Sequence, residues 1–135
     1  DGDCEEKLKA LVNELEINDN VIFTGRLYHK EIVRILSKAK AMLVYTSRDN
    51  NMLSIAESIA LATPVITTTT PNQSIYIKSE KLGIVNDEWT EDDLYEISLN
   101  NDEYVNKCLK YSKTIPYEYK VKQFIDVYNK YLKGR

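Results

Sequence analysis

Apolar residues along the chain alternate between helical spacing and short continuous runs. Residues 5–16 repeat leucine or valine at intervals of three and four, which predicts an amphipathic helix. The same reasoning predicts further helices at about 32–39, 53–62, 90–99, 101–112 and 117–132. Short runs rich in β-branched residues predict buried strands near 21–24, 41–45, 64–68 and 83–85.

This alternation of strands and helices predicts an α/β fold with a doubly wound, Rossmann-like parallel sheet that ends in a C-terminal helical segment. No linker or repeat divides the chain, so we expect one domain over 1–135, with an α/β part at 1–89 and helices at 90–135. Ligands of such sheets bind beyond the carboxyl ends of the strands. The loops after Thr24, Tyr45 and Thr68 are therefore the candidate binding loops.

Composition narrows the function classes. The 135 residues are 43% hydrophobic and carry a net charge of −3, which indicates a globular domain and argues against a nucleic-acid surface. No apolar run approaches the roughly 20 residues that span a bilayer. Cys4 and Cys108 lack a metal-binding spacing and are expected to be reduced thiols. Because His29 is the only histidine, we expect no metal site.

The most informative segment is residues 46–65, TSRDNNMLSIAESIALATPV. It resembles the signature of the GT-B glycosyltransferase group 1 family, roughly P-S-x-x-E-x-F-G-x-x-x-x-E-A-x-A-x-G-x-P-V. The two acidic positions of that signature correspond to Asp49, a shortened glutamate, and Glu57. The matching positions are Ser47, Ala60, Pro64 and Val65, and the departures are Thr46, Met52, Ser58 and Ala62.

The resemblance extends over residues 1 to about 132. Residues 19–25 are similar to the family's D-x-V-x-F-x-G strand, and the aromatic-rich segment 117–131 is similar to its closing helix. This implies the nucleotide-sugar-binding, C-terminal domain of a retaining hexosyltransferase that uses a nucleotide-diphosphate sugar and needs no metal or other cofactor. The family's first two strands, with their Arg/Lys diphosphate clamp, and its N-terminal acceptor-binding domain have no counterpart in this sequence.

The resemblance therefore implies a partial domain, and we expect the isolated chain to be inactive. The missing strands lie between the counterparts of 21–24 and 41–45 in the order 3-2-1-4-5-6, which would leave a gap with exposed sheet edges. We expect the parent protein to act in the cytoplasm, in bacterial surface-polysaccharide synthesis. Association with the inner face of the cell membrane, through the parent protein, is a further expectation.

The resemblance and helix electrostatics together assign candidate donor contacts. A helix that begins near Met52 presents free N–H groups at its start, so the backbone of Met52, Leu53 and Ser54 is expected to bind the diphosphate. Glu57, a turn later, is expected to accept hydrogen bonds from the ribose hydroxyls, and Asp49 from the donor sugar. Ordinary alternatives remain: Glu57 as an acidic residue favouring the helix start, and Asp49 as a loop or N-cap residue.

Two other segments complete the comparison with the family. Residues 25–30 look like its phosphate-binding G-R-L-x-x-x-K motif but follow the wrong strand, where the family holds the nucleotide base through loop backbone. Leu27 and Tyr28 are therefore the candidate base-binding residues, and His29 is interpreted as a solvated loop residue. Downstream, Ile75 occupies the position of the glutamate in the family's Gly-Gly-x-x-E segment.

Two other functions compete with the enzyme interpretation. The Asp49 substitution and the altered Gly-Gly-x-x-E segment fit a degenerate GT-B half that binds a nucleotide or a partner enzyme without turnover. A response-regulator-like domain would need an acidic cluster at the end of its first strand, and the sequence has none there.

Overall fold

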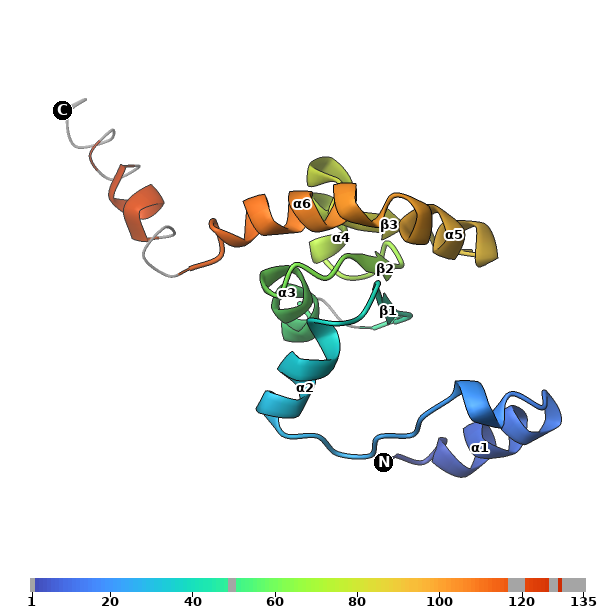
Figure 1. The fold of residues 1–135 in the computed structure, drawn as a ribbon. Coiled ribbons are helices and arrows are strands. Elements are labelled where there is room, and N and C mark those ends of the chain that lie inside the picture. The colour runs from blue at the N-terminus through green and yellow to red at the C-terminus, as the bar shows by residue number, and fades with distance from the viewer. Residues whose placement is uncertain (1, 49–50, 117–120, 127–128, 130–135) are drawn as a thin grey trace. The chain divides into compact units, whose positions relative to one another are not determined.

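The computed structural model describes residues 2–48, 51–116, 121–126 and 129. The chain divides into two units, Asp1–Ile32 and Val33–Arg135 (Figure 1). The first contains helix α1 (Glu5–Glu14) and the 3₁₀ helix η1 (Asn18–Asn20), while α2 (His29–Leu36) runs across the boundary. No helix in the described part of the chain is long and apolar enough to cross a membrane.

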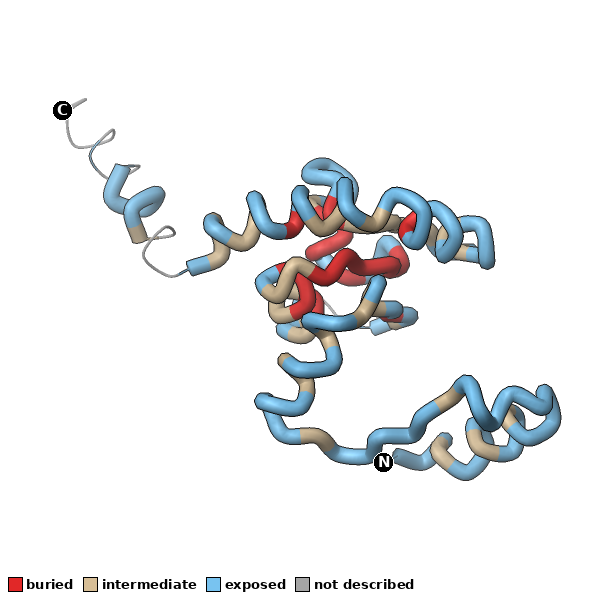
Figure 2. Tube along the Cα trace, viewed as in Figure 1, coloured by how far each residue is buried: buried red, intermediate tan, exposed pale blue. Residues whose placement is uncertain are grey.

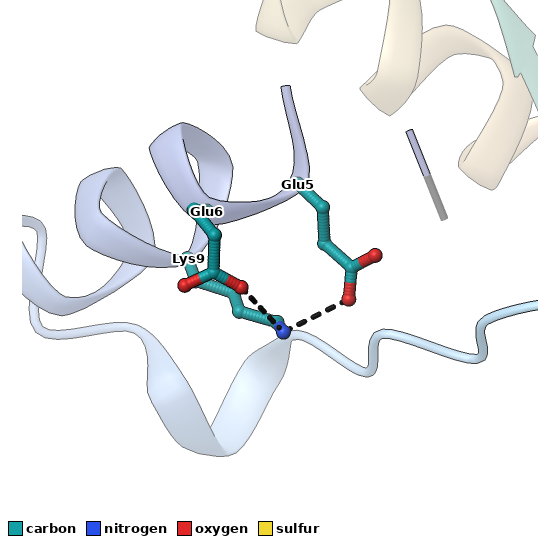
Figure 3. Close-up of polar contacts among 3 residues, drawn as sticks. All are labelled: Glu5, Glu6 and Lys9. Atoms are coloured by element: carbon teal, nitrogen blue, oxygen red, sulfur yellow. Dashed lines mark hydrogen bonds and ion pairs between the residues drawn. The ribbon is translucent and has the colours of Figure 1, made fainter. Parts of the chain in front are cut away.

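Helix α1 confirms the first predicted helix. Lys9 Nζ lies 2.8 Å from a carboxylate oxygen of Glu5 and 3.1 Å from one of Glu6, one turn back along the helix (Figure 3). The hydrogen bond that Lys9 donates to Glu5 lowers the pKa of Glu5 and raises the pKa of Lys9. Because these groups are exposed, the pair organises the helix surface and adds little to stability.

The predicted strand at 21–24 is wrong. These residues form no strand, and the side chains of Ile22 and Phe23 are 86% and 40% exposed. A strand is maintained by hydrogen bonds to a neighbouring strand. The described residues of Asp1–Ile32 form helices and connections only, so this unit supplies no such neighbour.

The second unit contains a parallel three-stranded sheet, which confirms the other three predicted strands and the α/β class (Figure 1). The strands β1 (Met42–Val44), β2 (Val65–Thr67) and β3 (Gly83–Val85) lie in the order β1-β2-β3. Their last residues, Val44, Thr67 and Val85, are in register. The carboxyl ends of all three strands therefore share one edge of the sheet.

Four helices accompany this sheet: α3 (Leu53–Ala60), α4 (Gln73–Glu80), α5 (Glu91–Leu99) and α6 (Asn101–Ser112). Helix α3 packs on α6 and β2, and both α4 and α5 pack on β3. A capping box formed by Thr90 and Asp93 begins α5. Three of the four confirm predicted helices, whereas α4 was not predicted. Of the predicted helix at 117–132, residues 121–126 are helical and 129 is described, while the others lie outside the described residues.

The core lies between β2 and the surrounding helices (Figure 2). It is formed by aliphatic side chains and one thiol: Val44, Ile55, Ile59, Val65, Ile77, Leu82 and Cys108. The rings of Tyr76 and Tyr111 stack beside it with centroids 5.3 Å apart. These contacts join α3, α4 and α6 around the sheet, so the position of α3 is fixed by burial of its apolar face.

Two backbone positions have special steric demands. A Cβ at Gly83 would collide with the backbone of Val65, because β2 and β3 approach each other closely there. Ala62, just after the end of α3, has φ of +63°, in the left-handed region that favours glycine. The related family signature has glycine at this position, and the helix-ending conformation explains why.

Candidate functional site

Three loops meet at the carboxyl edge of the sheet, and we call residues 45–48, 51–52, 68–72 and 86–90 the loop edge. The Thr68 hydroxyl donates to the carbonyl oxygen of Thr46 at 3.0 Å, which joins the loops after β1 and β2. The ring of Tyr45 lies edge-on to that of Trp89, with centroids 6.3 Å apart, which joins the loops after β1 and β3. The loop edge is therefore a connected structure and a suitable place for a ligand of a parallel α/β sheet.

Thr69 and Asp87 link the remaining pair of loops. The backbone N–H of Thr69 donates to Asp87 Oδ1 at 2.7 Å, and its hydroxyl lies 2.9 and 2.8 Å from the two carboxylate oxygens. The backbone hydrogen bond, followed by the hydroxyl hydrogen bond, lowers the pKa of Asp87. This carboxylate therefore acts within the protein as the acceptor that holds the Thr-rich loop in place.

Polar atoms without a partner also gather here. Among the described residues, the buried side-chain polar atoms that lack a hydrogen bond are Thr67 Oγ1, Gln73 Oε1 and Trp89 Nε1. Thr67 ends β2, Gln73 begins α4 directly after the second loop, and Trp89 lies in the third. Such atoms are rare in folded proteins and call for a partner such as a water, an ion or a ligand, and all three lie beside the carboxyl edge of the sheet.

Helix α3 begins at the loop edge, as predicted. Its N-cap residue, Met52, has an extended backbone and makes no side-chain capping hydrogen bond. The first N–H groups of a helix have no acceptor within the helix, which suits the start of α3 to binding an anion. Leu53 is 75% exposed and Ser54 is half-buried, so this end of the helix reaches the surface.

The two candidate carboxylates differ in what the structure describes. Glu57 lies in the second turn of α3 and is half-buried, while the buried face of the helix is formed by Ile55, Ser58 and Ile59. Asp49 lies outside the described residues. The ribose and sugar contacts assigned to these two residues therefore stay predictions.

The candidate base-binding residues belong to the first unit. Leu27 and Tyr28, with Arg26, line a hollow of about 460 Å³, and Tyr28 is 83% exposed. The backbone N–H of Tyr28 donates to a carboxylate oxygen of Glu31 at 2.8 Å, which fixes the entry to α2. His29 is the first residue of α2 rather than a loop residue. A base contact by Leu27 or Tyr28 stays a prediction.

Residues 1–115 match the family described as glycosyl transferases group 1. The chain belongs to this family. A solved structure of WaaG, a glycosyltransferase involved in lipopolysaccharide biosynthesis, is similar with a TM-score of 0.67 and 22% sequence identity. The match covers 81% of this chain and 31% of the WaaG chain, so the sequence spans about a third of that protein. No curated protein matches the chain.

These matches confirm two predictions: the chain is part of a GT-B glycosyltransferase of group 1, and its fold is of the predicted α/β class. Gln73, the first residue of α4 and the residue that directly follows the loop 68–72, was not predicted from the sequence. Its side chain is 3% exposed and contacts the start of α3. A single buried glutamine produces no periodic pattern or motif in the sequence. Its position beside α3 is therefore known only from the structure, where it begins helix α4.

Proposed function

We propose that this chain forms the donor-binding part of a glycosyltransferase that transfers a hexosyl group from a nucleotide-diphosphate sugar to a glycan or lipid-linked acceptor. The observation that carries the proposal is the start of α3 at the loop edge of a group 1 glycosyltransferase domain. There, the helix begins at the exposed Leu53, one turn before Glu57. Partial positive charge at a helix start suits a diphosphate, and a carboxylate suits a ribose diol.

The proposal assigns each group a role. The backbone N–H groups of Met52, Leu53 and Ser54 bind the diphosphate, Glu57 the ribose, and Asp49 the donor sugar. Leu27 and Tyr28 contact the base through their loop. None of these contacts requires a metal ion, because neutral donors and the helix dipole bind the phosphates.

The parent protein would supply what this sequence lacks. An N-terminal GT-B domain would bind the acceptor, and the first strand of the complete domain would contribute the Arg/Lys clamp. We place the parent protein in bacterial surface-polysaccharide synthesis, in the cytoplasm or at the inner face of the membrane. The 135-residue chain alone would bind donor without transferring sugar.

Titration with UDP and GDP, followed by NMR, tests the proposal. Each lost hydrogen bond to a charged group typically costs roughly 1.5–3 kcal/mol, and each 1.4 kcal/mol is about tenfold in affinity. A clamp of two such groups would separate a micromolar site from a millimolar one, so we expect millimolar binding that shifts the amide signals of Leu53 and Ser54. Shifts confined to other parts of the chain, or none with either nucleotide, would contradict the proposed site.

A second function is favoured by two specific positions. Asp49 replaces the first glutamate of the family signature, and Ile75 replaces the glutamate of the Gly-Gly-x-x-E segment. Both changes remove or shorten a sugar contact while leaving the helix start intact. A degenerate GT-B half would therefore bind nucleotide without turnover, and the full parent protein would then show nucleotide binding but no sugar transfer from any donor.

A further inference from the structure

Helix α4 contacts the start of α3 through its first residue. Gln73 Nε2 donates to the carbonyl oxygen of Met52 at 3.0 Å and to Asn51 Oδ1 at 2.6 Å. Because a backbone carbonyl can only accept, the Met52 contact requires the glutamine to present its NH₂ group on this side. These contacts join segments 21 and 22 residues apart in the sequence.

The Met52 carbonyl has a particular position in α3. It also accepts the hydrogen bond from Ile55 N–H at 3.1 Å, which belongs to the first turn of the helix. No side chain of the helix's own cap helps to fix that turn. Gln73 thus supplies from another helix the restraint that a capping side chain would normally supply locally.

Peptide geometry connects this restraint to the ligand. The carbonyl of Met52 and the N–H of Leu53 belong to one planar trans peptide unit, so they point in opposite directions within one plane. Fixing the carbonyl between Gln73 and Ile55 therefore fixes the direction of the Leu53 N–H. That N–H is one of the donors assigned to the diphosphate under the proposed function.

We propose that Gln73 is a positioning residue for the nucleoside diphosphate, which it orients through the Met52–Leu53 peptide without touching the ligand. The inference rests on the proposed function. The burial of Gln73 supports an indirect role, because the residue is 3% exposed and its side-chain NH₂ group donates both of its hydrogen bonds to protein acceptors. Preorganised donors bind an anion more tightly than donors that must be ordered on binding.

The test compares two neighbouring buried residues of α4 in the full chain. Gln73→Met keeps the length of the side chain and removes the donor. Ser74→Ala removes a partly buried hydrogen bond of similar kind, from Ser74 Oγ to the carbonyl oxygen of Thr69 at 3.1 Å, whose acceptor lies in the loop after β2 and not at the start of α3. Urea denaturation measures the structural cost of each substitution. Titration with UDP and GDP by NMR measures affinity and the response of the Leu53 and Ser54 amide signals.

We expect Gln73→Met to weaken nucleotide binding about three- to tenfold, within the range for one lost hydrogen bond, and to displace the Leu53 amide signal in the free protein. Ser74→Ala should bind within about twofold of the wild type. If the methionine variant does not fold, Gln73→Glu keeps the shape, replaces the donor with an acceptor, and should weaken binding at least as much.

The outcomes distinguish a failure of this inference from a failure of the proposed function on which it rests. If the wild type binds nucleotide and the Gln73 variants bind equally well, or no worse than Ser74→Ala, Gln73 is only structural and the inference is wrong. If the wild type binds neither nucleotide, the proposed function fails and the inference fails with it.

Discussion

The hydroxyl of Thr63 donates to the carbonyl oxygen of Leu36 at 2.6 Å, across 27 residues of sequence. Leu36 is the last residue of α2, and Thr63 precedes β2 in a turn where it is only 2% exposed. Both residues belong to the unit Val33–Arg135, and this hydrogen bond joins the end of α2 to the segment that leads into β2. The same carbonyl also accepts a hydrogen bond from the backbone N–H of Ala39 at 3.0 Å, so Thr63 supplies its second donor at the C-terminal end of the helix.

Thr63→Val should therefore destabilise the fold. Valine keeps the shape of threonine but removes one of the two donors to the partly buried Leu36 carbonyl, and the loss of one such hydrogen bond typically costs about 0.5–1.5 kcal/mol. Urea denaturation followed by circular dichroism measures the change. Thr70→Val is the matched control, because Thr70 is exposed, and it should change stability by less than about 0.5 kcal/mol. Equal effects of the two substitutions would contradict the assigned role.

Ala62→Gly should stabilise the protein by up to about 1 kcal/mol. Left-handed backbone costs a non-glycine residue roughly 1–2 kcal/mol, which exceeds the entropy that glycine adds to the unfolded chain. Ala60→Gly, two residues earlier at the last position of α3, should instead destabilise by roughly 0.5–1 kcal/mol. Thermal unfolding of both variants tests the difference in sign, and a loss of stability in both would refute this account of Ala62.

The two cysteines should differ strongly in thiol reactivity. Burial raises the pKa of Cys108 to about 12, and its Sγ contacts the carbonyl oxygen of Leu82 at 3.5 Å, whereas Cys4 is exposed. At pH 8, a disulfide reagent should modify Cys4 at once and Cys108 only as the protein unfolds. Cys4→Ser should then show almost no rapid reaction.

The same thiol makes stability depend on pH. In the unfolded chain Cys108 ionises near pH 8.5, but in the folded protein it stays protonated until much higher pH. The contribution of the thiol to the free energy of unfolding is complete below the pKa of Cys108 in the unfolded chain, and it is lost as the pH rises towards 12. Cys108→Ala should reduce this alkaline slope in urea denaturation, and an unchanged slope would assign it to other groups.

Under the proposed function, Glu57→Gln in the proposed parent glycosyltransferase should raise KM for the donor about tenfold with little change in kcat. Ribose contacts persist from the bound donor to the transition state, so their loss appears as weaker binding. Asp49→Asn should change KM less and lower kcat, because its proposed partner is the reacting sugar. Glu91→Gln, at an exposed position of α5, is the control. Wild-type kinetics for Glu57→Gln with every donor tested would make this residue structural.

Sequence patterns predicted correctly the three strands that have a hydrogen-bonded partner strand in the structure. The runs at 41–45, 64–68 and 83–85 became β1, β2 and β3 because each has a parallel partner that completes its hydrogen bonds. The run at 21–24 has the same β-branched character but no partner strand among the described residues of its unit. Strand propensity measures how well residues fit into a sheet, so a segment with high propensity forms no strand without a neighbouring strand.

Helix α4 shows the opposite limitation. The three consecutive apolar residues Ile75, Tyr76 and Ile77 do not show the spacing of an amphipathic helix. In the structure only Ile77 of the two isoleucines is buried, whereas Ile75 is 73% exposed. The need for a crossover between parallel strands β2 and β3 could have predicted it, since such connections are usually helical. The start of α3 was predicted from its loop and motif. The hydrogen bonds of Gln73 depend on three-dimensional proximity that no local pattern records.

Trp89 gives the loop edge an intrinsic optical label. It is the only tryptophan of the chain, and its indole packs edge-on against Tyr45 with its Nε1 buried. Indole emission depends on the polarity and packing around the ring, so fluorescence from this protein reports on one place at the edge of the sheet. Rearrangement of these loops can therefore be followed in real time, without a dye and without isotopes.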